Sequence, residues 1–162
     1  MYYDFQKDIL TGKESEEKFA NLLLKKCNQI KNISFNNDKR YDVLVELNNN
    51  KNITFEIKHD LMTGTTGNIA IETYCRGKLS GINVTEAEYF VIHCFTNQEH
   101  FYIFNTQILK NIVQQNLHNE ISGGDKDVYG NYTTRFVLLK LQNELNICID
   151  LFSLESLSFY NE

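Results

Sequence analysis

The stretch YDVLVELNNNKNITFEIKHD, residues 41–60, contains an aspartate, Asp42, and an acid-x-lysine tripeptide, Glu56-Ile57-Lys58. Carboxylate oxygens are the hard ligands that Mg²⁺ prefers, and one or two carboxylates usually hold this ion together with water. A lysine ammonium beside such a site adds positive charge where negative charge develops during a reaction. These side chains can therefore form a metal-dependent site if the fold brings them to one face.

Alternating apolar and polar residues on either side of three asparagines predict a β-hairpin in this stretch. If the chain turns about Asn49, Asp42 lies opposite Glu56, and Lys58 follows two residues along on the same face. Like charges facing each other across strands destabilise a hairpin by up to roughly 1 kcal/mol, and a cation between them would turn this repulsion into chelation. The opposite face is apolar and is expected in the core: Val43, Val45, Leu47, Ile53, Phe55 and Ile57.

A solvated hairpin face, in which Lys58 neutralises one of the acids, explains the same residues without any metal. The tripeptide by itself is a weak signal, because Glu16-Glu17-Lys18 matches it as well on a predicted helix. Positions two apart diverge on a helix but share a face on a strand. The hairpin register is therefore the stronger indication of a site.

The elements around the hairpin predict an α/β fold with a mixed central β-sheet, a catalytic hairpin and flanking helices. Three- and four-residue spacing of apolar residues, including Cys27 and Ile30, predicts a helix over 13–31, and a second helix is expected over 105–117. The Gly-rich segment 122–131 is expected to be a loop. Further strands are expected at 68–75, 88–95, 100–104, 135–141 and 146–150, followed by a short final helix.

Composition limits the class of protein. The 162 residues are 42% hydrophobic and 23% charged, which is typical of a folded chain, and we expect one domain over 1–162. The net charge of −5 argues mildly against a protein that coats nucleic acid by bulk electrostatics. No apolar run has the length of a membrane span and the first residues do not resemble a signal peptide, so a soluble, cytoplasmic protein without a membrane partner is expected. Four scattered cysteines indicate reduced thiols.

The histidines are not spaced as a zinc site requires. Strand alternation places His59 on the face opposite Lys58, which favours a structural role. His93 lies in an apolar strand and is expected in the core or an interface, whereas His100 and His118 are expected at the surface.

Together these features resemble the PD-(D/E)XK nuclease superfamily, in which two carboxylates and a lysine on a hairpin surround the attacked phosphate. That superfamily often adds a helix acid in a Gly-x-x-x-Glu pattern, which residues 12–16 match with Glu16; Glu17 is the competing candidate. Residues 66–92, with a strand glutamate and a Gly-Lys-x-Ser-Gly-Ile loop, resemble small phage and viral members. Tyr41 stands where the superfamily pattern has proline.

The resemblance implies a restriction-endonuclease-like fold and a Mg²⁺-dependent endonuclease acting on DNA, with Mn²⁺ as a substitute. It implies that Asp42 and Glu56 bind the metal, that Lys58 is catalytic and that Glu16 supports them. Glu72 becomes a candidate third metal-binding carboxylate. The remaining candidates are phosphate contacts in the Gly-containing loop: Arg76, Lys78, Ser80 and Gly81.

Small members of the superfamily with an early helix glutamate include Holliday junction resolvases, so branched or duplex DNA is the expected partner and a homodimer is expected by analogy. A non-catalytic nucleic-acid-binding or interaction module on the same fold is the first alternative. An RNA endonuclease is the second, although the viral type carries a helix histidine and residues 1–58 contain none.

Overall fold

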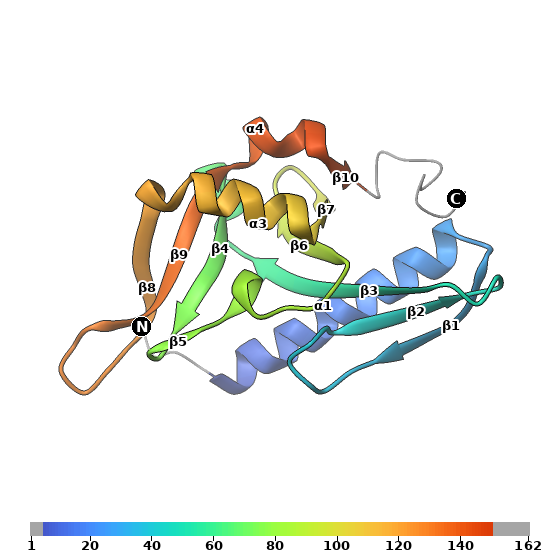
Figure 1. Cartoon of the computed structure of the whole chain (residues 1–162), viewed down its shortest axis with the longest axis horizontal. Helices are drawn as coiled ribbons and strands as arrows, with labels where there is room; N and C mark the ends of the chain where they lie inside the picture. The colour runs from blue at the N-terminus through green and yellow to red at the C-terminus, as the bar shows by residue number, and fades with distance from the viewer. Residues whose placement is uncertain (1–4, 151–162) are drawn as a thin grey trace.

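The computed structural model describes residues 5–150 (Figure 1). Its helices are α1 (Phe5–Lys26), α2 (Thr63–Thr66), α3 (Thr106–Gln115) and α4 (Leu141–Glu144), with 3-10 turns η1 (Gly81–Asn83), η2 (Leu117–Asn119) and η3 (Leu145–Ile147). Its strands are β1 (Ile30–Phe35), β2 (Val43–Leu47), β3 (Asn52–Asp60), β4 (Asn68–Cys75), β5 (Lys78–Leu79), β6 (Tyr89–Phe95), β7 (Glu99–Asn105), β8 (Glu120–Lys126), β9 (Tyr132–Lys140) and β10 (Cys148–Asp150). The expected final helix lies outside the described residues.

The strands form two sheets. The central sheet has the order β1-β2-β3-β6-β7-β10 and is mixed, because β3 pairs with β6 in parallel and the other neighbours are antiparallel. The second sheet, β5-β4-β9-β8, is antiparallel throughout. The predicted α/β class with a mixed central sheet and flanking helices is therefore confirmed.

The β2–β3 hairpin has the predicted register, with Val43 opposite Phe55 and Val45 opposite Ile53. Its apolar face is covered by α1, which runs along the hairpin in Figure 1. Phe19 of α1 meets Phe55 edge-on, with ring centroids 5.1 Å apart, and Phe55 also stacks on Tyr89 at 5.6 Å. All six predicted core residues of the hairpin are buried.

A second core lies on the other face of the central sheet, against α3 and the second sheet. Strand β6 serves both cores, because Val91 packs with the α1 side while Phe90 and Ile92 pack with the other side. A strand that is buried on both faces, as is common beside a parallel neighbour, has consecutive apolar residues and not alternating apolar and polar ones. The strand at 68–75 was correctly predicted, but it belongs to the second sheet and not beside the hairpin.

Two sequence predictions of local structure were wrong. The helix expected over 13–31 ends at Lys26, and Ile30 starts β1, where it pairs with Leu47. The segment 122–131 is not a loop throughout, because β8 extends to Lys126 and only residues 127–131 form the turn into β9. Gly124, with a φ of +74°, sits at a bulge in this hairpin, which is why a glycine-rich segment still forms a strand.

None of the helices in the described part of the chain is both long and apolar enough to cross a membrane.

Replacing Phe55 by alanine is expected to lower the free energy of unfolding by about 3–5 kcal/mol, because a fully buried ring leaves a cavity between α1 and the sheet. Phe35→Ala is the matched control, since its ring on β1 is 49% exposed, and its cost is expected below about 1 kcal/mol. Urea unfolding followed by circular dichroism measures both variants. Equal losses would contradict the packing described above.

Candidate active site

Asp42 lies just before β2 and is bound to β3 in an unusual way. Its backbone N–H donates to the carbonyl of Phe55 at 2.9 Å, and its Oδ2 accepts from the backbone N–H of Ile57 at 2.7 Å. The strand ladder itself ends at the pair Val43–Phe55. Asp42 therefore does not face Glu56 as a regular ladder pair, as the register suggested. Its carboxylate instead takes the place that a backbone carbonyl would have.

Glu56 and Lys58 share one face of β3, as strand alternation predicts. Lys58 Nζ lies 2.6 Å from Glu56 Oε1, and the Thr85 hydroxyl donates to Glu56 Oε2 at 3.3 Å. Glu56 is buried, whereas 44% of the Lys58 side chain is exposed. Thr85 was not identified from the sequence, because a lone threonine between β5 and β6 carries no pattern.

The helix supplies a third carboxylate. Glu16 lies one turn before the buried Phe19 on α1, and burial raises its pKa to about 7, with further raising by the charges of Asp42 and Glu56. Lys58 opposes these effects only in part. The sequence did not decide whether Glu16 or Glu17 is the helix acid of the site. In the structure Glu16 lines a cleft that also contains Asp42 and Lys58, and Glu17 is exposed.

Glu16, Asp42 and Lys58 meet in a cleft of about 570 Å³ between the two sheets. Glu16 from the start of α1 and Asp42 and Lys58 from the hairpin line one side. The other side is the outer face of the second sheet, which contributes Ala70, Gly124 and Phe136. The cleft therefore exists only because the second sheet stands beside the end of the hairpin.

The charges in the cleft affect one another. Burial is the main reason that the pKa of Glu56 is raised; the charge of Asp42 adds to it, and Lys58 opposes it. Burial acts to lower the pKa of Lys58, but the carboxylates of Glu56 and Asp42 outweigh it and leave this pKa raised. Lys58 therefore remains an ammonium at neutral pH. Three carboxylates around one ammonium leave an excess of negative charge when all are ionised.

The structure brings Glu72 near this group, but not into its centre. Glu72 lies half-buried on β4, opposite Phe136, and its charge contributes to the raised pKa of Lys58. Gly81 packs directly on its backbone, since a Cβ at Gly81 would lie 2.3 Å from the Glu72 carbonyl oxygen. Gly81 thus allows a close approach of η1 to β4.

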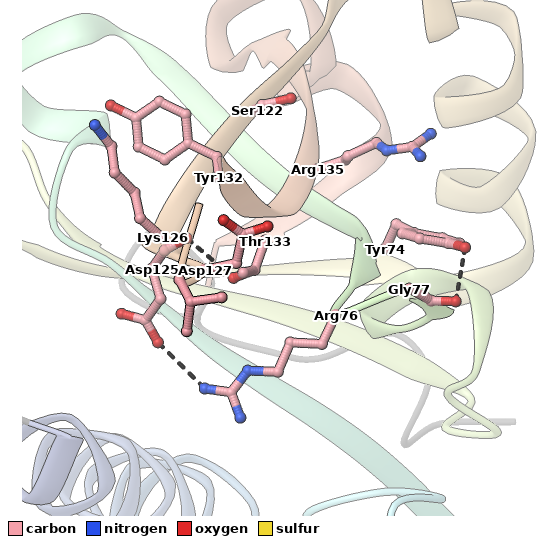
Figure 2. A pocket seen from close by; sticks show the side chains of 11 residues that line it. Tyr74, Arg76, Gly77, Ser122, Asp125, Lys126, Asp127, Tyr132, Thr133 and Arg135 are labelled. Atoms are coloured by element: carbon pink, nitrogen blue, oxygen red, sulfur yellow. Dashed lines mark hydrogen bonds and ion pairs between the residues drawn. The ribbon is translucent and has the colours of Figure 1, made fainter. Parts of the chain in front are cut away.

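The predicted phosphate contacts do not line the cleft. Lys78 is exposed on β5, and the Ser80 hydroxyl is buried without a hydrogen-bond partner among the described residues. Arg76 forms an ion pair with Asp125 at 3.3 Å in a separate cavity beside the turn between β4 and β5 (Figure 2). Arg76, Lys78, Ser80 and Gly81 therefore do not form one phosphate site at the cleft.

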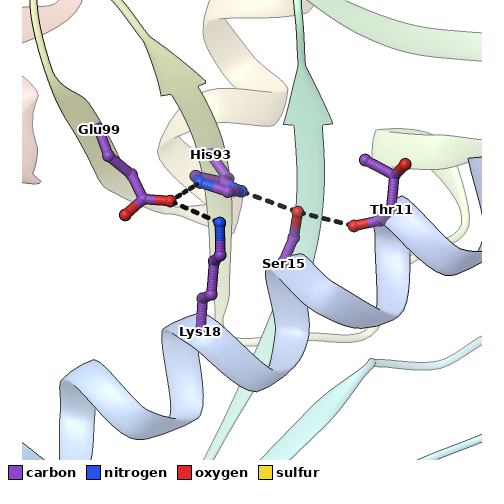
Figure 3. Close-up of polar contacts among 5 residues, drawn as sticks. All are labelled: Thr11, Ser15, Lys18, His93 and Glu99. Carbon is purple, nitrogen blue, oxygen red and sulfur yellow. Dashed lines mark hydrogen bonds and ion pairs between the residues drawn. The ribbon is translucent and has the colours of Figure 1, made fainter.

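A buried polar chain connects α1 to the central sheet. His93 lies between Ser15 Oγ, 2.7 Å from its Nδ1, and Glu99 Oε1, 2.8 Å from its Nε2, and Lys18 also pairs with Glu99 (Figure 3). Burial lowers the pKa of His93, and the hydrogen bond to Glu99 opposes this. Ser15 is 1% exposed and its hydroxyl bonds the Thr11 carbonyl, which excludes it as an accessible nucleophile.

The other histidines largely follow the sequence predictions. His59 lies on the α1 side of β3 and stacks on His93 with centroids 4.7 Å apart, and burial lowers its pKa. His118 is exposed, as expected, whereas His100 is half-buried and stacks on Tyr102.

Within residues 5–150, no group of three or more histidine, cysteine, aspartate or glutamate side chains is arranged to hold a metal ion. The cleft is lined by the carboxylates of Asp42 and Glu16, and the buried Glu56 lies behind them, paired with Lys58. Mg²⁺ commonly keeps several waters and binds through one or two carboxylates together with a substrate phosphate. The donor set fits such an ion better than one that needs a complete protein cage.

Comparison of the chain with protein-family models, with curated proteins and with solved structures finds no match.

Replacing Glu16 by glutamine tests the electrostatics of the cleft. Folding raises the pKa of Glu16 from 4.5 to about 7, so its proton is bound more tightly in the folded chain and stability is lost as the pH rises through this window. In EDTA at about pH 8, Glu16→Gln is therefore expected to raise the thermal midpoint by a few degrees, roughly 2–4 °C per kcal/mol regained. At about pH 5 the gain should be much smaller.

Glu17→Gln is the matched control, because Glu17 is the exposed neighbour on the same helix. It should leave the midpoint unchanged at both pH values. A Glu16→Gln variant that behaves like this control would show that Glu16 is not buried against the hairpin carboxylates.

Proposed function

We propose that the protein is a metal-dependent nuclease with a restriction-endonuclease-like core, which hydrolyses phosphodiester bonds in DNA. The observation that supports this most directly is the joint placement of Asp42, Lys58 and Glu16 in one cleft, with Glu56 bound to Lys58. A buried Glu56 with Asp42 and the half-buried Glu16 around one ammonium is costly unless a cation or a reaction uses the arrangement. A solvated hairpin face, the alternative interpretation of the sequence, does not account for the burial of Glu56.

Asp42 and Glu56 are the residues that would hold Mg²⁺, or Mn²⁺ in its place, with Glu72 as a further acid nearby. When bound, such an ion activates water and neutralises charge on the phosphate. Hydrogen bonds from Ile57 and Thr85 orient these two carboxylates before any ligand arrives. This fixed orientation reduces the rearrangement that binding requires.

Lys58 is positioned to interact with the scissile phosphate. Its ion pair with Glu56 holds the ammonium at the cleft, and its raised pKa keeps it charged, so it can stabilise the negative charge that develops on the phosphate oxygens. Glu16, with a pKa of about 7, exchanges a proton readily at neutral pH and is suited to accept one from the attacking water.

Branched DNA such as a Holliday junction, cut by a homodimer, remains the proposed substrate and assembly by analogy with small members of the superfamily. Two cleavage sites related by two-fold symmetry would cut opposed strands. The fold and the acids alone do not define the substrate, so the assay has to compare several nucleic acids.

Purified protein should cleave DNA with Mg²⁺ or Mn²⁺ and not in EDTA. Lys58→Ala and Glu56→Ala are expected to lower the cleavage rate by at least about a hundredfold, because each removes a group that acts on charge developing at the phosphate. The measurement is a gel assay on linear duplex, single-stranded DNA, a four-way junction and RNA.

Lys51→Ala is the matched control, since Lys51 is an exposed lysine at the turn of the same hairpin. It should cleave at the wild-type rate. Folded Lys58→Ala protein with wild-type activity would overturn the site, and preferential cleavage of RNA would assign the RNA endonuclease alternative.

A non-catalytic binding module is the second candidate, and one observation favours it: Glu56 is satisfied by Lys58 and Thr85 without any ion. Metal binding distinguishes the two. A native state that binds Mg²⁺ is stabilised by mass action, by about 2.7 kcal/mol at one hundred times the dissociation constant.

Millimolar Mg²⁺ or Mn²⁺ is therefore expected to raise the thermal midpoint of the wild-type protein by several degrees, at roughly 2–4 °C per kcal/mol. Glu56→Gln should lose most of this shift, and NaCl at matched ionic strength should not reproduce it. An unchanged midpoint in both proteins would favour the binding module.

A further inference from the structure

A second cavity, of about 880 Å³, lies at the far end of the second sheet. It is formed by the turn between β4 and β5 and by the distal half of the β8–β9 hairpin (Figure 2). Gly124, at the bulge of this hairpin, lines the cleft, and its neighbour Asp125 lines the cavity. The cleft and the cavity are thus separate hollows that share strand β8.

Two cation–aromatic pairs form the walls of the cavity. The guanidinium of Arg135 lies 4.6 Å from the ring centre of Tyr74, and the ammonium of Lys126 lies 4.9 Å from that of Tyr132. The Tyr74 hydroxyl donates to the Gly77 carbonyl at 2.7 Å, which fixes the ring in place. Tyr132 is 53% exposed, so its ring is open to a ligand.

The backbone around these pairs is held in a defined shape. Arg76 has a φ of +48°, which is uncommon for a residue other than glycine, and Gly77 follows at +79°. The Arg76 N–H donates to the Thr133 carbonyl at 2.8 Å, which ties this turn to β9. Such strained residues persist only where the surroundings hold them, and they gather at binding sites.

The hairpin tip is closed by hydrogen bonds and carries exposed apolar groups. Asp127 accepts hydrogen bonds from the backbone of Tyr129 and of Asn131, both at 2.9 Å. The side chains presented there, Val128 and Tyr129, are 93% and 87% exposed. An ordered tip with open apolar surface loses little conformational entropy when it contacts a ligand.

The charges favour an anion with an aromatic part. The two acids of the cavity already have partners, since Asp127 accepts hydrogen bonds within the turn and Asp125 pairs with Arg76. The two cations of the cation–aromatic pairs are less engaged. Lys126 makes no ion pair among the described residues, and Arg135 makes only a long one, 3.6 Å from Glu120. An unpaired nucleotide offers both parts, because its base stacks on tyrosine and its phosphate pairs with lysine or arginine. Bases inside a duplex are stacked on one another and cannot reach these rings.

We propose that this cavity binds unpaired nucleotides of a single-stranded nucleic acid. If the cleft cleaves nucleic acid, as proposed above, this site implies a substrate with an unpaired segment, and that implication rests on the proposed function. As a binding site it stands by itself, because nothing in the cation–aromatic walls depends on the carboxylates.

The test is fluorescence anisotropy with labelled oligo(dT), oligo(U) and a duplex of equal length, each about 12 nucleotides, in EDTA so that no cleavage occurs. Wild type should bind the single strands more tightly than the duplex. Tyr132→Ala is expected to raise the single-strand dissociation constant about tenfold, and Tyr132→Phe, which keeps the ring, to leave it nearly unchanged. Lys126→Ala should weaken binding and reduce its salt dependence.

Phe35→Ala and Lys51→Ala are the matched controls. Phe35 is an exposed aromatic residue on β1 and Lys51 is an exposed lysine at the turn of the β2–β3 hairpin, and neither lines the cavity. Both should bind as wild type does. The proposal is overturned if the wild type binds no single strand, if Tyr132→Ala binds like the controls, or if Tyr132→Ala weakens duplex binding equally. Oligo(dT) and oligo(U) distinguish DNA from RNA.

The two proposals fail separately. Tyr132-dependent binding in EDTA without cleavage of any substrate would support this site and oppose the nuclease. Lys58-dependent cleavage without Tyr132-dependent binding would do the reverse.

Discussion

The register of the β2–β3 hairpin determines which residues reach the core and which reach the cleft. With Val43 opposite Phe55, one face packs its apolar side chains under α1, and the other presents Glu56 and Lys58. A shift by one residue would exchange the two faces, bury charges under the helix and expose the core residues. The core under α1 thus fixes the position of the charged group, and the helix that covers this core also delivers Glu16.

The second sheet turns this charged face into a cleft. Strand β6 packs on both of its faces, so the central sheet can support α1 on one side and the second sheet on the other. The outer face of β4, β8 and β9 then closes over the end of the hairpin. Burial that results from this arrangement, more than any single contact, raises the pKa values of Glu16 and Glu56. The electrostatics of the cleft are therefore a product of tertiary packing.

The parts that could be predicted from the sequence are those with a local period. Alternation gave the hairpin and its register, and helical spacing placed Glu16 near Phe19. Strand β1 was missed because Cys27 and Ile30 continue the spacing of the helix, although Ile30 pairs with Leu47. Strand β8 was missed because its glycines indicate a loop. The second cavity could not be foreseen, since Tyr74 and Arg135 meet only through the pairing of β4 with β9. Thr85 likewise reaches Glu56 only through the fold.

The hydrogen bond from the Ile57 N–H to the Asp42 carboxylate gives that aspartate two duties. It joins β2 to β3 where the backbone ladder ends, and it presents an acid to the cleft. Selection on folding would therefore preserve Asp42 whether or not the cleft binds a ligand. Retention of this aspartate alone is thus a poor marker of function among divergent copies.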